Sequence, residues 1–378
     1  MILKELIKCL DKIFQVKLAE EWDNAGHLVG NGDKNVNKIL IALDVDEELI
    51  EEAKNCGAEL IISHHPPVFE PIRSVTDTTP TGSRILKLIQ EGIAVYSAHT
   101  NYDIMENGLN NIIVQKLGLT EVKPISSYKK NLYKLIIFVP TGTQDEVRKA
   151  ICSNGGGRLG DYSCCTFSSS GKGTFIPGKK TDPYIGETGE LSIVDEVRIE
   201  CIVEEEYLEG LLKEALKAHP YEEPAYDLYK LENRIMAGGL AKLGMLANPV
   251  TFNEFIGIIK KRLDIDGVGW IHRGIEDTGN RIIEKVAIAP GSSNSLTEEL
   301  AVLDCDLVLT GEISYHNGIR ISETGKIIAV VGHGTIERYF IDGAYDKVLE
   351  LKSNEKLDIE VLKSKSGYWT WRYDIGRC

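Results

Sequence analysis

The sequence predicts an α/β protein in which two related α/β halves form one core with a parallel or mixed sheet, and which carries an inserted α+β domain. Three observations lead to this prediction. Buried-strand patterns alternate with helical patterns near both ends of the chain, the two ends resemble one another, and the order of elements changes between them. Alternating strands and helices are typical of α/β folds, whereas a changed order indicates a separate domain.

The first half begins with a helix and continues as strands separated by helices. Apolar residues at helical spacing predict a helix over 5–14, and the glycine-punctuated stretch LAEEWDNAGHLVGNG predicts a loop. Buried-strand runs and helical stretches then alternate through 38–45, 46–57, 59–63, 83–92 and 93–98. Because connections of this length join parallel strands, we expect a parallel arrangement.

A weak internal repeat relates the two ends of the chain. Residues 38–65 align without gaps on residues 285–312, with seven of 28 positions identical, including Lys38 with Lys285. Two unrelated βαβ units could match this well by chance. Both segments, however, continue into a helix, a strand, and a loop that carries histidine and acid, which favours two related halves.

The middle of the chain follows another order. Strand patterns at 132–139, GDYSCCTFSSS, GTFIP, VDEVRIECIV and AYDLYKL enclose two helical patterns, DEVRKAICSNG and EYLEGLLKEALKAHP. The order βαββαβ with an added hairpin is the ferredoxin-like split βαβ pattern. We therefore expect an inserted domain at 128–232 and a discontinuous core at 1–127 and 233–378.

Composition excludes several classes of protein. The 378 residues carry 43 basic and 57 acidic side chains, a net charge of −14, which disfavours nucleic acid and membrane surfaces as partners. The longest aliphatic runs are far shorter than the roughly 20 residues of a membrane span, and the N-terminus lacks a signal-peptide cleavage site, so we expect a cytoplasmic protein. Eight cysteines without a CxxC pair predict structural thiols rather than disulfides or a cysteine zinc site.

Histidines and acids follow four of the predicted strands. His64 and His65 end ELIIS, His99 and Asp103 follow IAVYSA, Glu312 follows LVLTG, and His333 and Glu337 follow IIAVV. Because ligands of open parallel sheets bind outside the carboxyl ends of the strands, we expect these four loops to converge.

Five of these residues form a candidate metal site. Adjacent histidines suit a metal pair, and His333 and Glu337 share one helix face, where the carboxylate could bridge two cations. Asp103 would add an oxygen. Imidazole and carboxylate donors suit Zn²⁺, Mn²⁺, Fe²⁺, Co²⁺ or Ni²⁺, with zinc the first expectation and two ions per chain. Asp103 could instead cap the following helix.

Further polar residues are candidates for catalysis or positioning. His99 could bind metal, orient a ligand or simply pack in the core. Glu312 and His316 could act as general base or acid, or could bind backbone amides and face solvent, respectively. Asp23 and Asn24 could act in catalysis or order their own loop. The segment HPYEEP (219–224) could hold a ligand or form a rigid helix exit that docks on a neighbouring subunit.

The motifs EEWDNAGHLVG, SHHPPVF, AHTNYD, TGEISYH and GHGTIE, in this order, resemble the dinuclear-metal-centre proteins known as GTP cyclohydrolase 1 type 2 homologues. The resemblance implies that residues matching His64, His65, Asp103, His333 and Glu337 hold the metal pair, with the glutamate bridging. It also implies a hexameric ring and an insert similar to CutA and P-two signalling proteins. His27 stands where the family has leucine, and the ending GYWTWRYDIGRC departs from the family pattern.

Two functions follow as hypotheses. The first is a dinuclear metal-dependent hydrolase in which Glu312, His316 and His99 are the catalytic candidates. Its substrate would be a small molecule, a nucleotide or pterin precursor, cleaved by purine ring opening of the GTP cyclohydrolase type or by phosphoester hydrolysis. The alternative is a non-catalytic protein that stores or delivers metal, or a regulator whose insert senses an effector.

Overall fold

The computed structural model describes residues 1–273 and 278–366. The chain folds into two compact units. The first unit comprises Met1–Tyr128 together with the described residues from Ala237 onward, and the second unit comprises Lys129–Met236. Two long strands, β5 (Leu119–Pro140) and β8 (Tyr226–Thr251), contribute residues to both units. The unusual C-terminal sequence, 367–378, lies outside the described residues.

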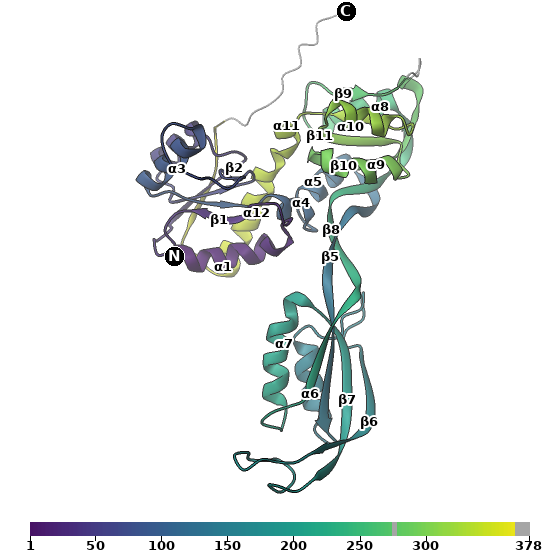
Figure 1. Ribbon diagram of the computed structural model, residues 1–378. Helices are drawn as coiled ribbons and strands as arrows, with labels where there is room; N and C mark the ends of the chain where they lie inside the picture. Colours follow the sequence, from purple (N-terminus) through teal and green to yellow (C-terminus); the bar gives the residue numbers. More distant parts are fainter. Residues whose placement is uncertain (274–277, 367–378) are drawn as a thin grey trace, which may run out of the picture. The chain divides into compact units, whose positions relative to one another are not determined.

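A five-stranded sheet organises the N-terminal half of the first unit (Figure 1). The strand order is β1 (Gly26–Val29), β4 (Ala94–Ser97), β3 (Leu60–Ser63), β2 (Lys38–Ala42) and β13 (Glu360–Lys363). The last four strands are parallel, with Leu60 opposite both Ile39 and Ala94, and β1 is antiparallel to β4. The sheet is therefore mixed.

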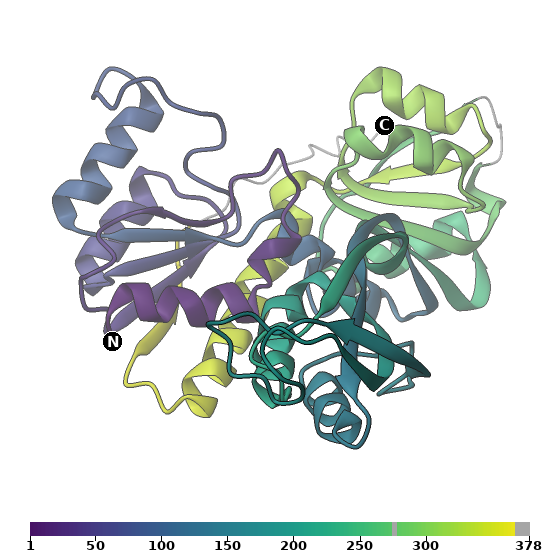
Figure 2. The same ribbon diagram turned by 60° about the horizontal axis from the view of Figure 1, so that its bottom comes forward.

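Helices cover both faces of this sheet because side chains alternate along its strands. On one face, Ile39, Ile41 and Ile62 pack with α1 (Leu3–Ile13) and α12 (Tyr339–Asn354), two helices that contact one another (Figures 1 and 2). On the other face, Leu40, Ile61 and Val95 pack against α2 (Glu47–Cys56) and α3 (Pro80–Glu91). A short 3-10 turn, η1 (Val16–Leu18), follows α1.

Local sequence signals set the bounds of α2 and α3. The side chain of Asp46 accepts a hydrogen bond from the backbone N–H of Leu49, and Thr79 caps α3 in the same way. Each helix ends at a glycine in the left-handed region, Gly57 with φ 72° and Gly92 with φ 69°. Glycine adopts this conformation without steric cost, so both helices end there and a strand follows each of them.

The C-terminal half of the first unit repeats this plan. Its strands follow the order β8, β10 (Ile282–Ser292), β11 (Leu307–Glu312), β12 (Ile327–Val330) and β9 (Gly269–Ile271). The three central strands are parallel and the outer two are antiparallel to their neighbours. One face packs on α5 (Leu109–Leu117) and α8 (Phe252–Arg262), the other on η3 (Asn294–Leu296), α9 (Thr297–Val302) and α10 (Tyr315–Ser322). A 3-10 turn, η2 (Thr278–Asn280), precedes β10.

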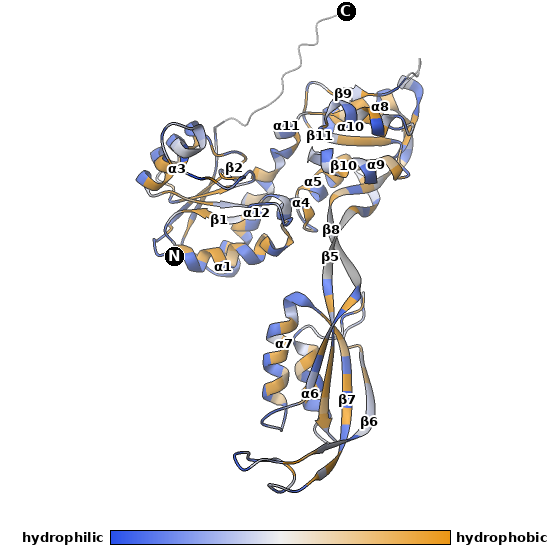
Figure 3. Ribbon diagram, viewed as in Figure 1, coloured by the Kyte–Doolittle hydropathy of each residue, from blue (hydrophilic) through white to orange (hydrophobic). Residues whose placement is uncertain are grey.

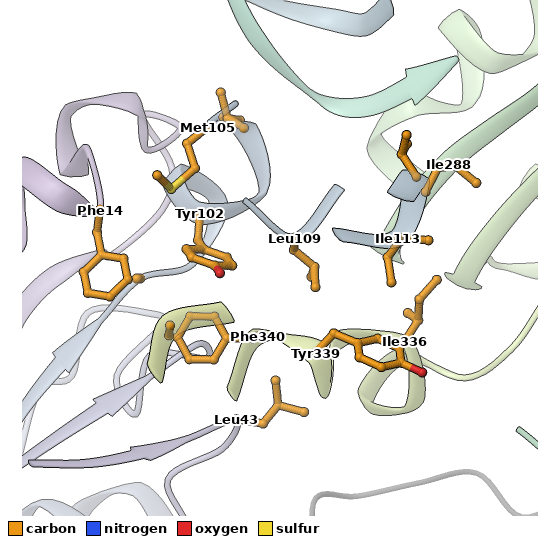
Figure 4. Close-up of a cluster of buried hydrophobic side chains, with 14 of the residues drawn as sticks. Phe14, Leu43, Tyr102, Met105, Leu109, Ile113, Ile288, Ile336, Tyr339 and Phe340 are labelled. Atoms are coloured by element: carbon orange, nitrogen blue, oxygen red, sulfur yellow. The ribbon is translucent and has the colours of Figure 1, made fainter. Parts of the chain in front are cut away.

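The predicted repeat corresponds to equivalent elements. Residues 38–65 form β2, α2 and β3, and residues 285–312 form most of β10, then η3, α9 and β11. One hydrophobic cluster joins the halves (Figure 4). In this cluster Tyr102 and Leu109 lie near Phe340, whereas Ile113 and Ile336 lie nearer Ile288 of the second sheet. The two related α/β halves therefore share one core, as the sequence predicts.

The second unit has the chain order β5, α6 (Gln144–Ser153), β6 (Thr166–Phe175), β7 (Ser192–Glu204), α7 (Glu205–Ala218) and β8. Its sheet order is β6, β7, β5, β8, which is the order of a split βαβ unit. Hydrophobic and hydrophilic residues alternate along β7 (Figure 3), and its buried residues Ile199, Cys201 and Val203 face α6 and α7.

Two expectations for this region are wrong. The runs GDYSCCTFSSS and GTFIP do not form two strands of an added hairpin, because Thr166–Phe175 is one continuous strand paired with β7 throughout. Cys152 and Cys164 form a disulfide, with Cα atoms 4.9 Å apart, rather than two free thiols. Their 12-residue separation carries no recognisable motif, since only the fold brings the end of α6 beside the segment before β6.

In the described part of the chain, no helix is both long enough and apolar enough to cross a membrane.

Candidate metal centre

The five predicted metal ligands lie at the carboxyl ends of strands in the first unit. His64 and His65 directly follow β3. Asp103 lies in the short helix α4 (Thr100–Ile104), which follows β4. His333 and Glu337 are the first and last residues of α11 (His333–Glu337), which follows β12. The two sheets thus bring their strand ends, and these side chains, to one place.

Glu337 lies at the centre of this cluster. Its Oε2 atom is 2.9 Å from the Nε2 atom of His65 and 2.9 Å from the Nε2 atom of His333. Its Oε1 atom is 3.7 Å from the Nε2 atom of His64, which in turn is 3.8 Å from the Oδ1 atom of Asp103. Two groups of residues have potential ligand atoms that lie within 4.8 Å of one another, and both groups include His65. The first group is His64, His65 and His99, and the second is His65, His333 and Glu337.

Burial makes this cluster costly without a cation. The side chains of His64 and Glu337 are 0% and 4% exposed. Within the described structure, the buried atoms His64 Nε2 and Asp103 Oδ1 have no hydrogen-bond partner. Unpaired buried polar atoms are destabilising, and nitrogen and carboxylate donors at one point match the ligand preferences of divalent transition metals. The residues therefore fit a metal site.

Contacts behind the histidines direct their Nε2 atoms inward. The Nδ1 atom of His64 lies 2.8 Å from the carbonyl oxygen of Ala98, and that of His65 lies 2.7 Å from Asp44 Oδ1. The Nδ1 atom of His333 lies 3.3 Å from Glu312 Oε1. Such contacts fix ring orientation and tautomer in metal sites. Asp44 was not identified from the sequence as a site residue. A signal for it was present, because Asp44 lies near the end of the strand run KILIALDV, just as the predicted ligands follow strand ends.

The charges in the cluster are strongly coupled. Burial alone would lower the pKa of His65, but the carboxylates of Asp44 and Glu337 raise it to about 10. Burial, and then the charge of Glu337, raises the pKa of Asp103 well above its ordinary value. Burial also acts to raise the pKa of Glu337, but the histidines outweigh it and hold that pKa well below its usual range. Protons thus neutralise the charge that a bound cation would otherwise balance.

His99 lies beside the cluster and is held by Asp23. Its Nδ1 atom is 2.7 Å from Asp23 Oδ1, while the other carboxylate oxygen accepts hydrogen bonds from the backbone N–H and the hydroxyl of Thr100. Burial raises the pKa of Asp23, but these bonds outweigh it and lower the pKa to about 2. Asp23 therefore orients His99. The side chain of Asn24 donates a hydrogen bond to the carbonyl oxygen of Val68 and so ties its loop to the segment that follows β3.

The remaining candidates lie in different positions. Glu312 contacts His333 from behind, the position of an orienting carboxylate. His316 is exposed on α10 next to Tyr315, with ring centroids 5.4 Å apart, and belongs to neither ligand group. Asp103 does not cap the following helix, because α5 has Gly108 at its N-cap. His27 lies in β1 opposite Tyr96.

Two glycines make room for the cluster. A Cβ atom on Gly291, which has φ +65°, would lie 2.3 Å from Glu337 Oε1, and one on Gly311 would lie 2.9 Å from the Cα atom of His333. A larger residue at Gly291 would displace the carboxylate of Glu337, and one at Gly311 would collide with backbone atoms of His333 and Gly291. Neither glycine is distinguishable in the sequence from an ordinary loop glycine.

The surface around the site is partly aromatic and partly acidic. Trp22 and Phe69 are exposed, and Phe69 contacts the edge of His99 with ring centroids 6.0 Å apart. On the other side, a cavity of about 590 Å³ reaches His65. Its charged lining residues are Asp44, Asp46, Glu47, Glu48 and Arg84.

Comparisons with known proteins agree with this architecture. The family Duf34/NIF3 (NGG1p interacting factor 3) matches residues 1–367. A Halalkalibacterium halodurans protein called GTP cyclohydrolase 1 type 2 homolog is 37% identical over 360 residues, 95% of each chain, and a Bacillus subtilis protein of the same name is 32% identical over 364 residues, 96% of each chain. The crystal structure of a Bacillus cereus protein related to NIF3 matches with a TM-score of 0.87 and 34% identity over 98% of both chains. The chain therefore belongs to the Duf34/NIF3 family.

Proposed function

We propose that this protein is a metal-dependent hydrolase with two divalent cations, zinc first among them, bound by His64, His65, Asp103, His333 and Glu337. The observation that carries the proposal is the buried carboxylate of Glu337, which lies 2.9 Å from the imidazoles of both His65 and His333. A carboxylate placed between two sets of imidazole donors can bridge two ions. Bound ions would lower the pKa of water and stabilise negative charge on the attacked atom.

The protein's own residues would position the reactants and move protons. His99, fixed by Asp23, is the candidate for accepting a proton from water and returning it to the leaving group. Glu312 acts through His333, whose ring it orients, so we assign it a positioning role. His316 remains a catalytic candidate only for a substrate that extends to the exposed surface of α10.

The substrate is proposed to be a nucleotide or a related phosphoester. The names of the relatives suggest GTP, for which one water would attack C8 of the purine and break the C8–N9 bond, and a second water would hydrolyse the resulting formamide and release formate. Plain phosphoester hydrolysis would require the same arrangement of ligands and proton carrier.

The test is to load the protein with each candidate metal and to follow GTP and a simple phosphoester by chromatography. The Glu337→Ala protein serves as the blank. We expect a metal-dependent product that the blank does not form. Full turnover by a folded Glu337→Ala protein would contradict this mechanism.

A second candidate function is metal storage or delivery. It is favoured by the cavity beside His65, where Asp44, Asp46, Glu47 and Glu48 face a single Arg84. This excess of negative charge would attract a cation and repel a triphosphate. Rapid transfer of metal to an apo-acceptor, without turnover of any substrate, would support delivery. Tightly held metal that does not exchange would contradict it.

We also propose a homo-oligomer, with the hexameric ring as the expected assembly. Large apolar side chains are exposed on the second unit, including Phe167, Leu191 and Ile193. Exposed apolar side chains that lie together are typical of interaction surfaces. Native mass spectrometry should show the assembly, and a monomer at micromolar concentration would contradict it.

A further inference from the structure

A cavity of about 400 Å³ lies entirely within the second unit. It is lined mainly by the end of β6, the segment that follows this strand, and the residues that follow α7. Four aromatic rings line it, those of Phe138, Phe175, Tyr184 and Tyr221. Cavities of this size with apolar walls and a few polar groups are the usual form of small-molecule sites.

The charged groups of this cavity are all acidic. Glu196, Glu222 and Glu223 line it, and the described lining contains no lysine, arginine or histidine. Arg198, two residues after Glu196 on β7, pairs with Glu200 at 3.1 Å. The exposed Lys179 and Lys180 precede the lining residue Thr181, and none of these three basic residues is part of the lining. The side chains that line the cavity therefore carry a net negative charge, which no basic side chain of the lining neutralises.

Glu196 is held in place at the wall of the cavity. The hydroxyl of Tyr221 donates a hydrogen bond of 3.2 Å to Glu196 Oε1. Burial and the charge of Glu196 raise the pKa of Tyr221 to about 12, so this hydroxyl stays protonated. A Cβ atom on Gly173 would lie 2.3 Å from Glu196 Oε2, so a larger residue at this position would displace the carboxylate.

The segment HPYEEP (219–224) shapes the remaining wall. The Nε2 atom of His219 lies 2.8 Å from the carbonyl oxygen of Phe138, and its Nδ1 atom accepts a hydrogen bond from the backbone N–H of Tyr221. These bonds hold the backbone at Tyr221, and the centroid of its ring is 5.9 Å from that of Phe175 and 6.2 Å from that of Tyr184. The aromatic walls are thus preorganised around the carboxylate.

We propose that this cavity binds an organic ammonium ion, with the charged group at Glu196 and the apolar body against the rings of Phe175, Tyr184 and Tyr221. A carboxylate attracts an ammonium group, and aromatic faces attract cations through their quadrupoles. An anionic ligand would meet three carboxylates and no basic residue. This site is independent of the metal centre and of its proposed reaction.

Three probes with the same ring separate charge from shape. Tyramine carries an ammonium group, 4-ethylphenol is its neutral counterpart, and 4-hydroxyphenylacetate is negatively charged. Isothermal titration calorimetry of the full-length protein should show binding of tyramine, about tenfold or more weaker binding of 4-ethylphenol, and none of 4-hydroxyphenylacetate. Tyramine binding should also weaken as salt is added.

Two variants test the role of the carboxylate. Glu196→Gln keeps the shape of the side chain and should weaken tyramine binding about tenfold or more without changing that of 4-ethylphenol. Tyr221→Phe keeps the ring, removes the hydrogen bond to Glu196, and should weaken tyramine binding less. Glu209→Gln, an exposed substitution on α7 outside the cavity, is the matched control and should bind tyramine like the unmodified protein.

Three outcomes would overturn the proposal. Equal binding of tyramine and 4-ethylphenol would mean that the cavity selects no charge, and unchanged binding by a folded Glu196→Gln protein would remove the carboxylate from the site. Failure of all probes, together with a changed oligomeric state of Glu196→Gln in sedimentation, would assign the cavity to contacts between copies of the chain.

Discussion

The Nε2 atom of His65 lies 2.9 Å from the Oε2 atom of Glu337, although the two residues follow strands in different halves of the first unit. This contact joins the ends of the two sheets. It is also the place where the structure concentrates imidazole and carboxylate groups that are buried or half-buried. The proposed chemistry of the protein depends on this contact.

Replacing Glu337 by glutamine should abolish stable metal binding. Glutamine keeps the size of the side chain but removes the charge that balances the cation, so we expect metal affinity to fall by about 100-fold or more. Competition with a chromophoric chelator measures this change. Glu299→Gln, an exposed substitution on α9, is the control, and an unchanged metal content of Glu337→Gln would contradict the bridging role.

Metal binding should release protons and strengthen as the pH rises. Asp44 and Glu337 raise the pKa of His65 to about 10, so His65 is protonated at neutral pH when no metal is bound. A ligand nitrogen must lose its proton, and a group with a raised pKa holds that proton until the pH approaches about 10. Affinity should therefore increase from neutral pH toward that value.

Calorimetry in buffers of different ionisation enthalpy counts the released protons. Asp44→Asn removes one of the two carboxylates that raise the pKa of His65, so fewer protons should be released at neutral pH. Equal heats in all buffers would contradict this linkage.

Much of the fold and part of the site were predictable from local patterns. Strand runs such as ELIIS and the repeat of 38–65 in 285–312 depend on burial and periodicity, which short segments carry by themselves. The convergence of His64, Asp103 and His333 followed from one rule about the carboxyl ends of parallel strands. That rule needs only the order of elements.

Other features depend on contacts between distant segments. Asp23 holds His99 across 76 residues of sequence, and nothing in WDN shows which side chain it will meet. Gly291 matters because α11 happens to pack against it. Cys152 and Cys164 meet only because the segment before β6 returns to α6. The proposed metal pair, its ligand set and the boundaries 128–232 stay predictions.

Truncating Phe340 should destabilise the core that joins the two halves. Its ring is fully buried and lies 4.9 Å, between centroids, from both His64 and Tyr102. Replacement by alanine should lower the free energy of unfolding by about 3–5 kcal/mol, because it removes buried contacts and leaves a cavity. Urea denaturation of the metal-free protein measures this loss.

Val302→Ala is the control for that experiment. Val302 is 86% exposed at the end of α9, so its truncation should change stability by less than about 0.5 kcal/mol. A similar small effect of Phe340→Ala would mean that the cluster between the halves contributes little to stability.

Replacing Asp23 by asparagine should separate the positioning of His99 from the binding of metal. The ionised carboxylate of Asp23 can only accept a hydrogen bond from the Nδ1–H group of His99, whereas asparagine can also donate its amide N–H and favour the other tautomer. For the substrate found in the metal-loading assay, turnover should fall by about 100-fold or more, the range of general acid–base catalysis. The metal content should stay unchanged, because neither Asp23 nor His99 is among the five proposed ligands. Asp33→Asn, which disrupts an exposed ion pair with Lys4, should leave both quantities unchanged.

The acid stability of the same pair gives a readout that needs no substrate. Because hydrogen bonds from His99 and Thr100 lower the pKa of Asp23 to about 2, its carboxylate stabilises the folded protein above the ordinary aspartate pKa. That contribution is lost as the pH falls toward about 2, so the unmodified protein should lose stability over this range more steeply than Asp23→Asn. If the stability of the two proteins fell equally with pH, the carboxylate of Asp23 would not be held by His99. If the two slopes differed but Asp23→Asn kept full turnover, the role of Asp23 would be structural only.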